Sequence, residues 1–123
     1  MDAGLYLHIP FCKSKCAYCD FASFAGQEAF MHRYAQRVKQ EIAEKASRFP
    51  RTISPLFIGG GTPSLFPAEE MRGLLEEIHA HFPFAENAEC TCECNPGTVT
   101  PAFLQMLKEM GINRLSFGAQ AAQ

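Results

Sequence analysis

Three cysteines near the start of the chain have a spacing that suits metal chemistry. Cys12, Cys16 and Cys19 form the pattern C-x3-C-x2-C, directly after a short apolar stretch at residues 5–9. Thiolates are the soft ligands that iron–sulfur clusters select, and a cubane cluster usually takes four of them. Three cysteines leave one iron without a protein thiolate, and a reactive metal centre needs such an open coordination site. The spacing therefore predicts a reactive iron–sulfur cluster held by these three residues.

The same cysteines have alternative interpretations. Zinc would need a fourth ligand, which His8 or a distant cysteine could supply, but the paired C-x2-C hooks of structural zinc sites are absent. Buried free thiols are a poor match to a loop that contains Lys13–Lys15. A disulfide framework needs a secreted chain, and residues 1–4 have neither the basic region nor the long apolar core of a signal peptide. A zinc-stabilised structural module remains the alternative from another class of protein.

A second group of cysteines follows a different pattern. Cys90, Cys92 and Cys94 alternate with Thr91 and Glu93, so a strand places the three thiols on one face and the other two side chains on the opposite face. Same-face positions of a regular strand are about 6.6 Å apart, too far for three sulfurs to converge on one ion. We expect small apolar side chains facing a helix layer, with a second metal site as the less favoured alternative.

Composition restricts the class of protein. The chain has 123 residues, of which 47% are hydrophobic and 20% charged, with a formal net charge of -2. This length predicts one compact unit with a real core, and this charge gives no electrostatic footprint for nucleic acid or an anionic membrane. No apolar run approaches the roughly 20 residues of a membrane span. Cysteine usage without a signal sequence predicts a reducing, cytoplasmic location.

The first half of the chain predicts two strands around one helix. Residues 5–9 read as a strand, and residues 27–47 read as a helix. The helix carries an apolar stripe, at Met31, Ala35, Val38 and Ile42. Pro50 and Pro55 are predicted to bracket a linker, after which residues 56–58 form a short buried strand.

The second half continues the alternation. Pro67 suits the first residue of a second helix, whose stripe is Met71, Leu74, Leu75 and Ile78. Residues 89–94 read as the third strand and 114–117 as the fourth. Between them Thr100 is expected to cap a third helix that has Pro101 in its first turn and stops at Gly111. Alternation of this kind predicts an α/β fold of parallel βαβ units, as an open sheet or as part of a barrel.

Two further motifs fall at the ends of predicted strands. The run GGGTPS at residues 59–64 is neither a P-loop nor a dinucleotide fingerprint, since it lacks the Gly-Lys pair and the third spaced glycine. Consecutive glycines let a ligand approach the backbone, although an ordinary turn would use them as well. Glu93 ends the third strand within Glu-Cys-Asn-Pro, and a carboxylate there is costly to bury without a partner.

The cysteine segment as a whole resembles a known family. Residues 8–21, HIPFCKSKCAYCDF, look like the cluster loop of the radical S-adenosylmethionine (SAM) superfamily. Within it they resemble the branch that contains oxygen-independent coproporphyrinogen III oxidase and a related heme chaperone. The resemblance implies a [4Fe–4S] cluster on Cys12, Cys16 and Cys19, with SAM bound to the open iron. One electron from such a cluster breaks the sulfur–C5′ bond of SAM and yields a 5′-deoxyadenosyl radical.

The same resemblance implies a set of cofactor contacts. The glycine motif corresponds to the SAM-binding segment of the family, and the glutamate of the Glu-x-Asn/Asp-Pro pattern contacts SAM. The segment Asn113–Gln120 resembles the fourth-strand motif whose glutamine reaches the ribose. The residues so implied are Tyr6, Tyr18, Gly60, Gly61, Thr62, Glu93 and Gln120. We assign His8, which also precedes the cluster loop in the family, no catalytic step.

The implied fold is a (β/α)6 partial barrel, of which residues 1–123 would be the N-terminal part, with about four parallel strands and three helices. Coproporphyrinogen oxidase proper has a fourth cysteine two residues beyond the third, where this chain has Phe21. This departure favours a heme chaperone over the oxidase, which remains the alternative. The implied partners are SAM, heme or a porphyrin, a heme-acceptor protein and an electron donor.

Overall fold

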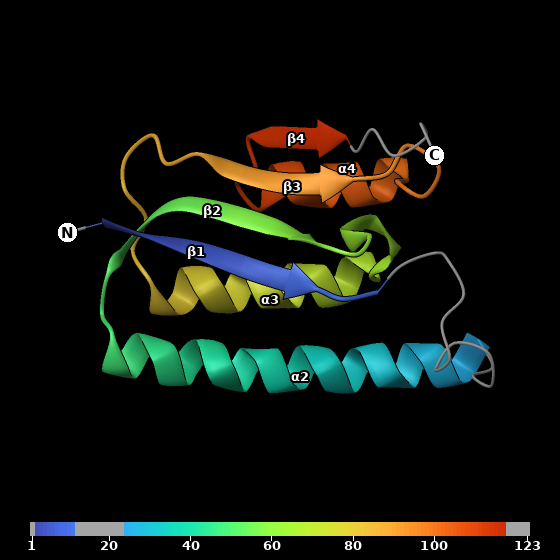
Figure 1. Cartoon of the computed structure of the whole chain (residues 1–123), viewed down its shortest axis with the longest axis horizontal. Coiled ribbons are helices and arrows are strands. Elements are labelled where there is room, and N and C mark those ends of the chain that lie inside the picture. Colours follow the sequence, from blue (N-terminus) through green and yellow to red (C-terminus); the bar gives the residue numbers. More distant parts are fainter. Residues whose placement is uncertain (1, 12–23, 118–123) are drawn as a thin grey trace.

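The computed structural model describes residues 2–11 and 24–117, with side chains from Glu28 onward in the second stretch. Strands and helices alternate along it. They are β1 (Asp2–Ile9), α2 (Phe24–Arg48), β2 (Thr52–Gly60), the short 3-10 helix η1 (Pro63–Leu65), α3 (Ala68–His81), β3 (Cys90–Cys94), α4 (Pro101–Glu109) and β4 (Arg114–Phe117). The strands form one sheet in the order β1-β2-β3-β4, and each neighbouring pair is parallel (Figure 1). The predicted α/β fold of parallel βαβ units is confirmed.

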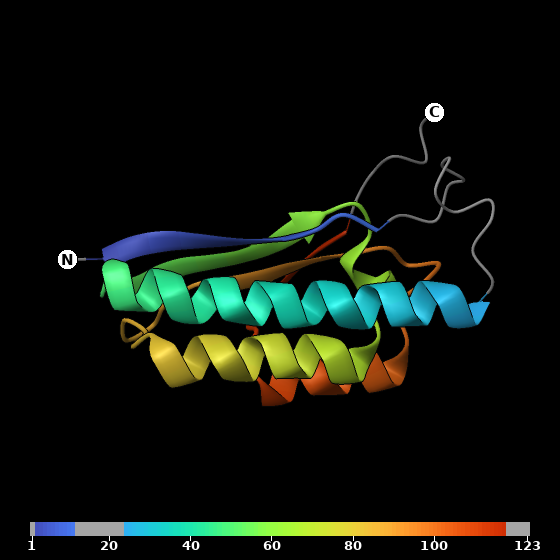
Figure 2. The ribbon, with the colours of Figure 1, turned by 90° about the horizontal axis from the view of Figure 1, so that it is seen from below.

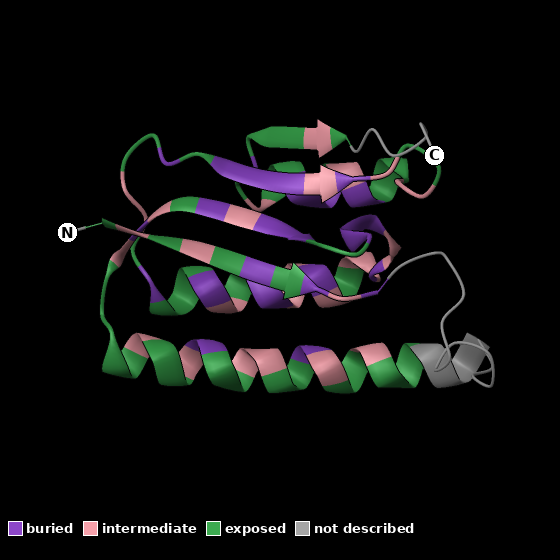
Figure 3. Cartoon of the chain, in the orientation of Figure 1, coloured by how far each residue is buried: buried purple, intermediate pink, exposed green. Residues whose placement is uncertain are grey.

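The sheet has one covered face and one open face. Figure 2 shows α2, α3 and α4 together on the same side of the sheet. The apolar stripe of α3 is fully buried beneath the strands, and Ala35 and Ile42 of α2 are also buried. Along β1, buried and exposed residues alternate, because successive side chains of a strand point to opposite faces (Figure 3). The open face therefore presents every second residue of each strand, without a helix over it.

One predicted boundary is wrong. Pro50 and Pro55 were expected to bracket a linker, but β2 begins at Thr52 and contains Pro55. The register of β1 against β2 shifts between Ala3 and Leu5, opposite this proline. Proline has no N–H to donate, and a bulge is a place where a strand tolerates it. The bulge depends on the partner strand, which the local sequence does not reveal.

The helix ends largely follow the sequence. The hydroxyl of Thr100 accepts a hydrogen bond from the amide of Phe103 at 3.1 Å, which confirms the predicted cap of α4. Gly111 follows the helix with a φ of +91°, a left-handed conformation that glycine adopts without strain. The helix α3 begins at Ala68, one residue later than predicted, so Pro67 is the residue before the helix and not its first residue. Among the described residues, no helix is long and apolar enough to cross a membrane.

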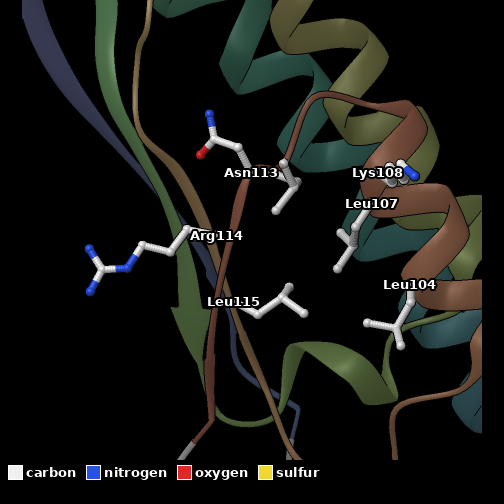
Figure 4. A pocket seen from close by; sticks show the side chains of 7 residues that line it. Leu104, Leu107, Lys108, Asn113, Arg114 and Leu115 are labelled. Carbon is white, nitrogen blue, oxygen red and sulfur yellow. The ribbon is translucent and has the colours of Figure 1, made fainter.

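The β4 edge of the sheet is the least covered region of the described chain. A groove of about 330 Å³ lies between α4 and β4, and Leu104, Leu107 and Leu115 point into it (Figure 4). Arg114 points away from the groove (Figure 4). Leu115 is 38% exposed although it shares a face with the buried Cys92, its register partner. The helix layer therefore thins out beyond α4.

Candidate cofactor site at the carboxyl ends of the strands

The predicted cofactor residues of β1, β2 and β3 meet near the carboxyl ends of these strands. Parallel register pairs Tyr6 with Phe57 and His8 with Gly59, so all four residues face the open side of the sheet. Tyr6 is 54% exposed, and its ring stacks on that of Phe57 with centroids 5.8 Å apart and planes 12° apart. Glu93 belongs to the face of β3 opposite the cysteines, as the alternation predicts. The carboxyl ends of parallel strands are where βα folds place their ligand sites.

Gly59 is the residue that lets these side chains come together. A Cβ at this position would lie 2.7 Å from Cε2 of Phe57, 2.8 Å from Oε1 of Glu93 and 3.0 Å from the hydroxyl of Tyr6. Any larger residue would push these tips apart. The sequence interpretation singled out Gly60 and Gly61 and missed Gly59. Strand alternation could have found it, because Gly59 lies two residues after Phe57 and therefore on the same face.

Gly60 connects the glycine loop to Glu93. Its amide donates a hydrogen bond to Oε1 of Glu93 at 3.2 Å, across 33 positions of sequence. Its φ is +122°, and a Cβ there would lie 2.6 Å from the carbonyl oxygen of Ile9. The position therefore requires glycine for its backbone conformation and for its close approach to the end of β1.

The next two amides extend the contact with β1. The amide of Gly61 donates to the carbonyl of Ile9 at 2.9 Å, and that of Thr62 donates to the carbonyl of Phe11 at 2.5 Å. Thr62 is buried. The three successive amides of Gly60, Gly61 and Thr62 thus already donate within the chain. A cationic group of a ligand would be bound here by carbonyl or carboxylate oxygens.

An aromatic cluster holds the end of β1 where the cysteine segment starts. The ring of Phe11 meets the rings of Phe30 and Tyr34 edge-on and stacks on Phe66, with centroid distances of 5.4–5.7 Å. The hydroxyl of Tyr34 donates to the carbonyl of His8 at 2.6 Å. Burial raises the pKa of Tyr34, and the nearby Glu41 raises it further, so the hydroxyl remains a donor. This cluster anchors α2 to the strand that precedes Cys12.

A second set of hydrogen bonds joins the glycine loop to the segment after β3. The hydroxyl of Ser64, in η1, accepts from the amide of Asn95 at 3.3 Å. The hydroxyls of Ser64 and Thr98 are 2.5 Å apart, and that of Thr98 donates to the carbonyl of Asn95 at 3.3 Å. Ser64 is buried, whereas Asn95 and Thr98 are partly exposed, so these bonds are partly shielded from water. Sequence analysis did not assign Ser64, Asn95 or Thr98 a role.

The described residues contain only part of the predicted site. The structure brings together Tyr6, Gly60 and Glu93, with Gly61 and Thr62 in the same loop. The other predicted residues lie outside the described part of the chain: Cys12, Cys16, Tyr18, Cys19 and Gln120. Within residues 2–11 and 24–117, no three metal-ligating side chains converge.

The strand cysteines are buried on the covered face, as predicted. Cys90, Cys92 and Cys94 have relative exposures of 5%, 0% and 4%. Burial raises the pKa of Cys90. A hydrogen bond between the thiols of Cys92 and Cys94, together with burial, raises the pKa of Cys92, and the same hydrogen bond lowers the pKa of Cys94. Protonated, buried thiols such as those of Cys90 and Cys92 are poor metal ligands and poor nucleophiles.

The fold and the site define the class of protein. Residues 6–123 match the radical SAM superfamily, and the chain belongs to that superfamily. It is 42% identical to the heme chaperone HemW of Haemophilus influenzae and 41% identical to HemW of Escherichia coli. Both alignments cover 96% of this chain and 32% of the relative, so the chain spans about a third of the length of these proteins.

A solved structure supports the same assignment of fold. Coproporphyrinogen III oxidase (HemN) from Escherichia coli, described as a radical SAM enzyme, superposes with a TM-score of 0.80 at 33% sequence identity. The match covers 95% of this chain and 27% of the oxidase. The described strands and helices thus match the N-terminal part of a radical SAM fold, as the resemblance implied.

Proposed function

We propose that residues 1–123 are part of the radical SAM core domain of a heme chaperone, and that this part binds a [4Fe–4S] cluster and SAM. Cys12, Cys16 and Cys19 would hold the cluster. Bound there, the cluster would chelate SAM at its open iron and supply the electron that cleaves it. The described residues would do the rest of the binding, by orienting SAM over the open face of the sheet.

One observation carries the proposal. The amide of Gly60 bonds to Glu93, and the next two amides bond to the end of β1, the strand that leads to the three cysteines. Three motifs far apart in sequence thus meet at one edge of the sheet, in a chain that belongs to the radical SAM superfamily. A Cβ at Gly59 would collide with Glu93 and Tyr6, so glycine is what lets these two side chains converge over the backbone at the ends of the strands.

The chemistry of these groups suits the amino-acid end of SAM. Its ammonium is a donor, and the amides of the glycine loop are already used within the chain. Carbonyl oxygens of the loop and the second oxygen of Glu93 are acceptors that fit an ammonium. The exposed ring of Tyr6, stacked on Phe57, offers an apolar wall and a hydroxyl beside them.

The choice of a heme chaperone rests on two features. Relatives named heme chaperone HemW are 36–42% identical over nearly the whole chain. The chain also has Phe21 where, by the resemblance, the oxidase carries a fourth cysteine. Heme, an acceptor protein and an electron donor are the partners this function would require, in the reducing cytoplasm.

The test uses the full-length protein, purified and reconstituted without oxygen. We expect iron and sulfide in the ratio of a cubane cluster, a change of its electron paramagnetic resonance spectrum on addition of SAM, and transfer of bound heme to an apo-hemoprotein. Decarboxylation of coproporphyrinogen III in place of heme transfer would identify the oxidase. Stoichiometric zinc without iron would identify the structural module and contradict both.

A further inference from the structure

A closed ring of hydrogen bonds begins and ends on Asn95, two residues after Glu93. The backbone N–H of Asn95 can only donate a hydrogen bond, and its backbone carbonyl can only accept one. Since the hydroxyl of Ser64 accepts from that amide and the hydroxyl of Thr98 donates to that carbonyl, Ser64 donates to Thr98 across the 2.5 Å between them. In this arrangement each of the two hydroxyls has one donor and one acceptor role. The carbonyl of Asn95 also accepts from the amides of Thr98 and Val99, at 2.9 and 3.0 Å.

This ring is one of two cross-links between the same pair of segments. In the first, a side chain of β3, Glu93, accepts from a backbone amide of the glycine loop, Gly60. In the second, a side chain that follows the glycine loop, Ser64, accepts from a backbone amide that follows β3, Asn95. The two bonds are reciprocal, because each segment supplies one backbone amide and one side-chain acceptor. Together they connect residues 60–64 to residues 93–95 at both ends of these stretches.

The two cross-links differ in their surroundings. Ser64 is 7% exposed, whereas Glu93 is only partly buried beside Gly60. A buried hydrogen bond resists exchange with water better than a solvated one, and a buried amide without a partner is costly. The ring is partly buried and the bond from Gly60 to Glu93 is exposed, so the ring is the less solvated of the two cross-links.

We propose that Ser64 and Thr98 are positioning residues for cofactor binding: their hydrogen-bond ring holds Glu93 at the distance from the glycine loop at which its carboxylate can bind SAM. The proposal rests on the proposed SAM site. The atoms nearest to a Cβ at Gly59 belong to Phe57, Glu93 and Tyr6. The effect of Ser64 and Thr98 therefore passes through the backbone of residues 93–95 to Glu93.

The test measures the affinity of the full-length, cluster-loaded protein for SAM. Ser64→Ala removes the ring's buried hydroxyl, and Thr98→Val removes the second hydroxyl while it preserves the shape of the side chain. We expect each to weaken SAM binding about 5- to 20-fold, as the loss of one or two hydrogen bonds implies. Thr98→Ser keeps the hydroxyl and should restore affinity to within twofold of wild type.

A Glu93→Gln background separates positioning from simple loss of stability. If the ring acts through Glu93, Ser64→Ala should have little further effect on SAM affinity once Glu93 has been replaced. Thr100→Ala, which removes the cap of α4, is the matched control: it should lower the melting temperature without changing SAM affinity.

The outcomes are distinguishable. Wild-type protein with an intact cluster that does not bind SAM would refute the proposed function. SAM affinity of Ser64→Ala and Thr98→Val within twofold of wild type would overturn the positioning role alone, as would an undiminished Ser64→Ala effect in the Glu93→Gln background. If Ser64→Ala does not fold, the Thr98→Val and Thr98→Ser pair decides the question.

Discussion

The two faces of β3 place their side chains in different environments. On the covered face, Cys90, Cys92 and Cys94 pack against the helices and are nearly inaccessible. On the open face, Glu93 accepts a hydrogen bond from Gly60, and its carboxylate lies close to the backbone of Gly59. Thiols are more reactive than a carboxylate by type, but these three are buried and out of reach of a ligand on the open face.

The comparison teaches that position outweighs residue type. A thiol needs to be deprotonated to ligate a metal, and burial raises the pKa of Cys90 and contributes to the raised pKa of Cys92, so these two thiols are held in the protonated form. The proposed ligands Cys12, Cys16 and Cys19 are in a different context, a segment with two lysines. The following predictions test the contrast between the covered and the open side.

The largest effect is expected from cysteine replacement. Changing Cys12, Cys16 or Cys19 to Ala should abolish the cluster, because each would supply one of the three thiolates that hold it. Cys92→Ala should leave the cluster's absorption and paramagnetic spectra intact. Iron content and spectra after anaerobic reconstitution measure both. Loss of iron from a folded Cys92 variant would show that the ligand assignment is wrong.

On the open face, Glu93→Gln should weaken SAM binding about 10- to 100-fold, which is the range for a hydrogen bond to a charged group. The amide oxygen of glutamine can still accept from Gly60, so the fold should survive. Equilibrium dialysis with SAM measures the effect. Thr91→Val, an isosteric change on the same face of the strand, is the control and should bind SAM as wild type does. If Glu93→Gln binds SAM with the same affinity as Thr91→Val, Glu93 is not part of the site.

Gly59→Ala should have a smaller effect on the same site. The new Cβ would displace the flexible tips of Glu93 and Tyr6 but leave the backbone unstrained, whereas the positive φ of Gly60 makes that residue unsuitable for the test. We expect SAM affinity to fall about threefold to tenfold, the value of a partly lost hydrogen bond.

A glycine in a helix provides the matched control for this variant. A Cβ at Gly73, in α3, would meet only the end of the flexible Lys39 side chain, at 3.0 Å. Alanine is the better helix former, so Gly73→Ala should raise the free energy of unfolding by up to about 1 kcal/mol and leave SAM affinity unchanged. If Gly59→Ala binds SAM as well as Gly73→Ala does, the side chains that meet at Gly59 do not contribute to SAM binding.

The smallest effect concerns the covered face and pH. The ordinary thiol pKa is 9.0, and that of Cys92 is raised in the folded chain. Above pH 9 the unfolded chain therefore loses a proton that the folded chain keeps, and the free energy of unfolding should fall as pH rises. Urea unfolding of cluster-free protein at pH 9 and pH 10 measures this, above the range in which the lowered pKa of Cys94 has the opposite effect. Cys92→Ala should show a shallower pH dependence, and an equal one would contradict the assignment to this thiol.

Local pattern was sufficient for much of the molecule. The alternation of Cys90, Cys92 and Cys94 with Thr91 and Glu93 predicted that the three thiols share the covered face, because a strand has a period of two. The cap at Thr100 and the stop at Gly111 followed from groups that act within one turn of helix. Each of these features depends on residues close together in sequence.

Other features needed the tertiary structure. Pro55 lies inside β2 because β1 shifts its register opposite to it, and no residue near Pro55 announces its partner. The need for glycine at position 59 exists because the side chains of Tyr6 and Glu93, from two other strands, meet there.

The hydrogen-bond ring is the clearest case. It joins Ser64 to Thr98 across 34 positions of sequence. A serine and a threonine are ordinary residues of a turn, and their sequence contains no information about the separation of their hydroxyls. The sequence by itself determined the strands, the helix ends and the face on which each side chain lies. The packing of parallel strands decided which of those side chains meet, because hydrogen bonds act over a few ångströms of space and not over a distance along the chain.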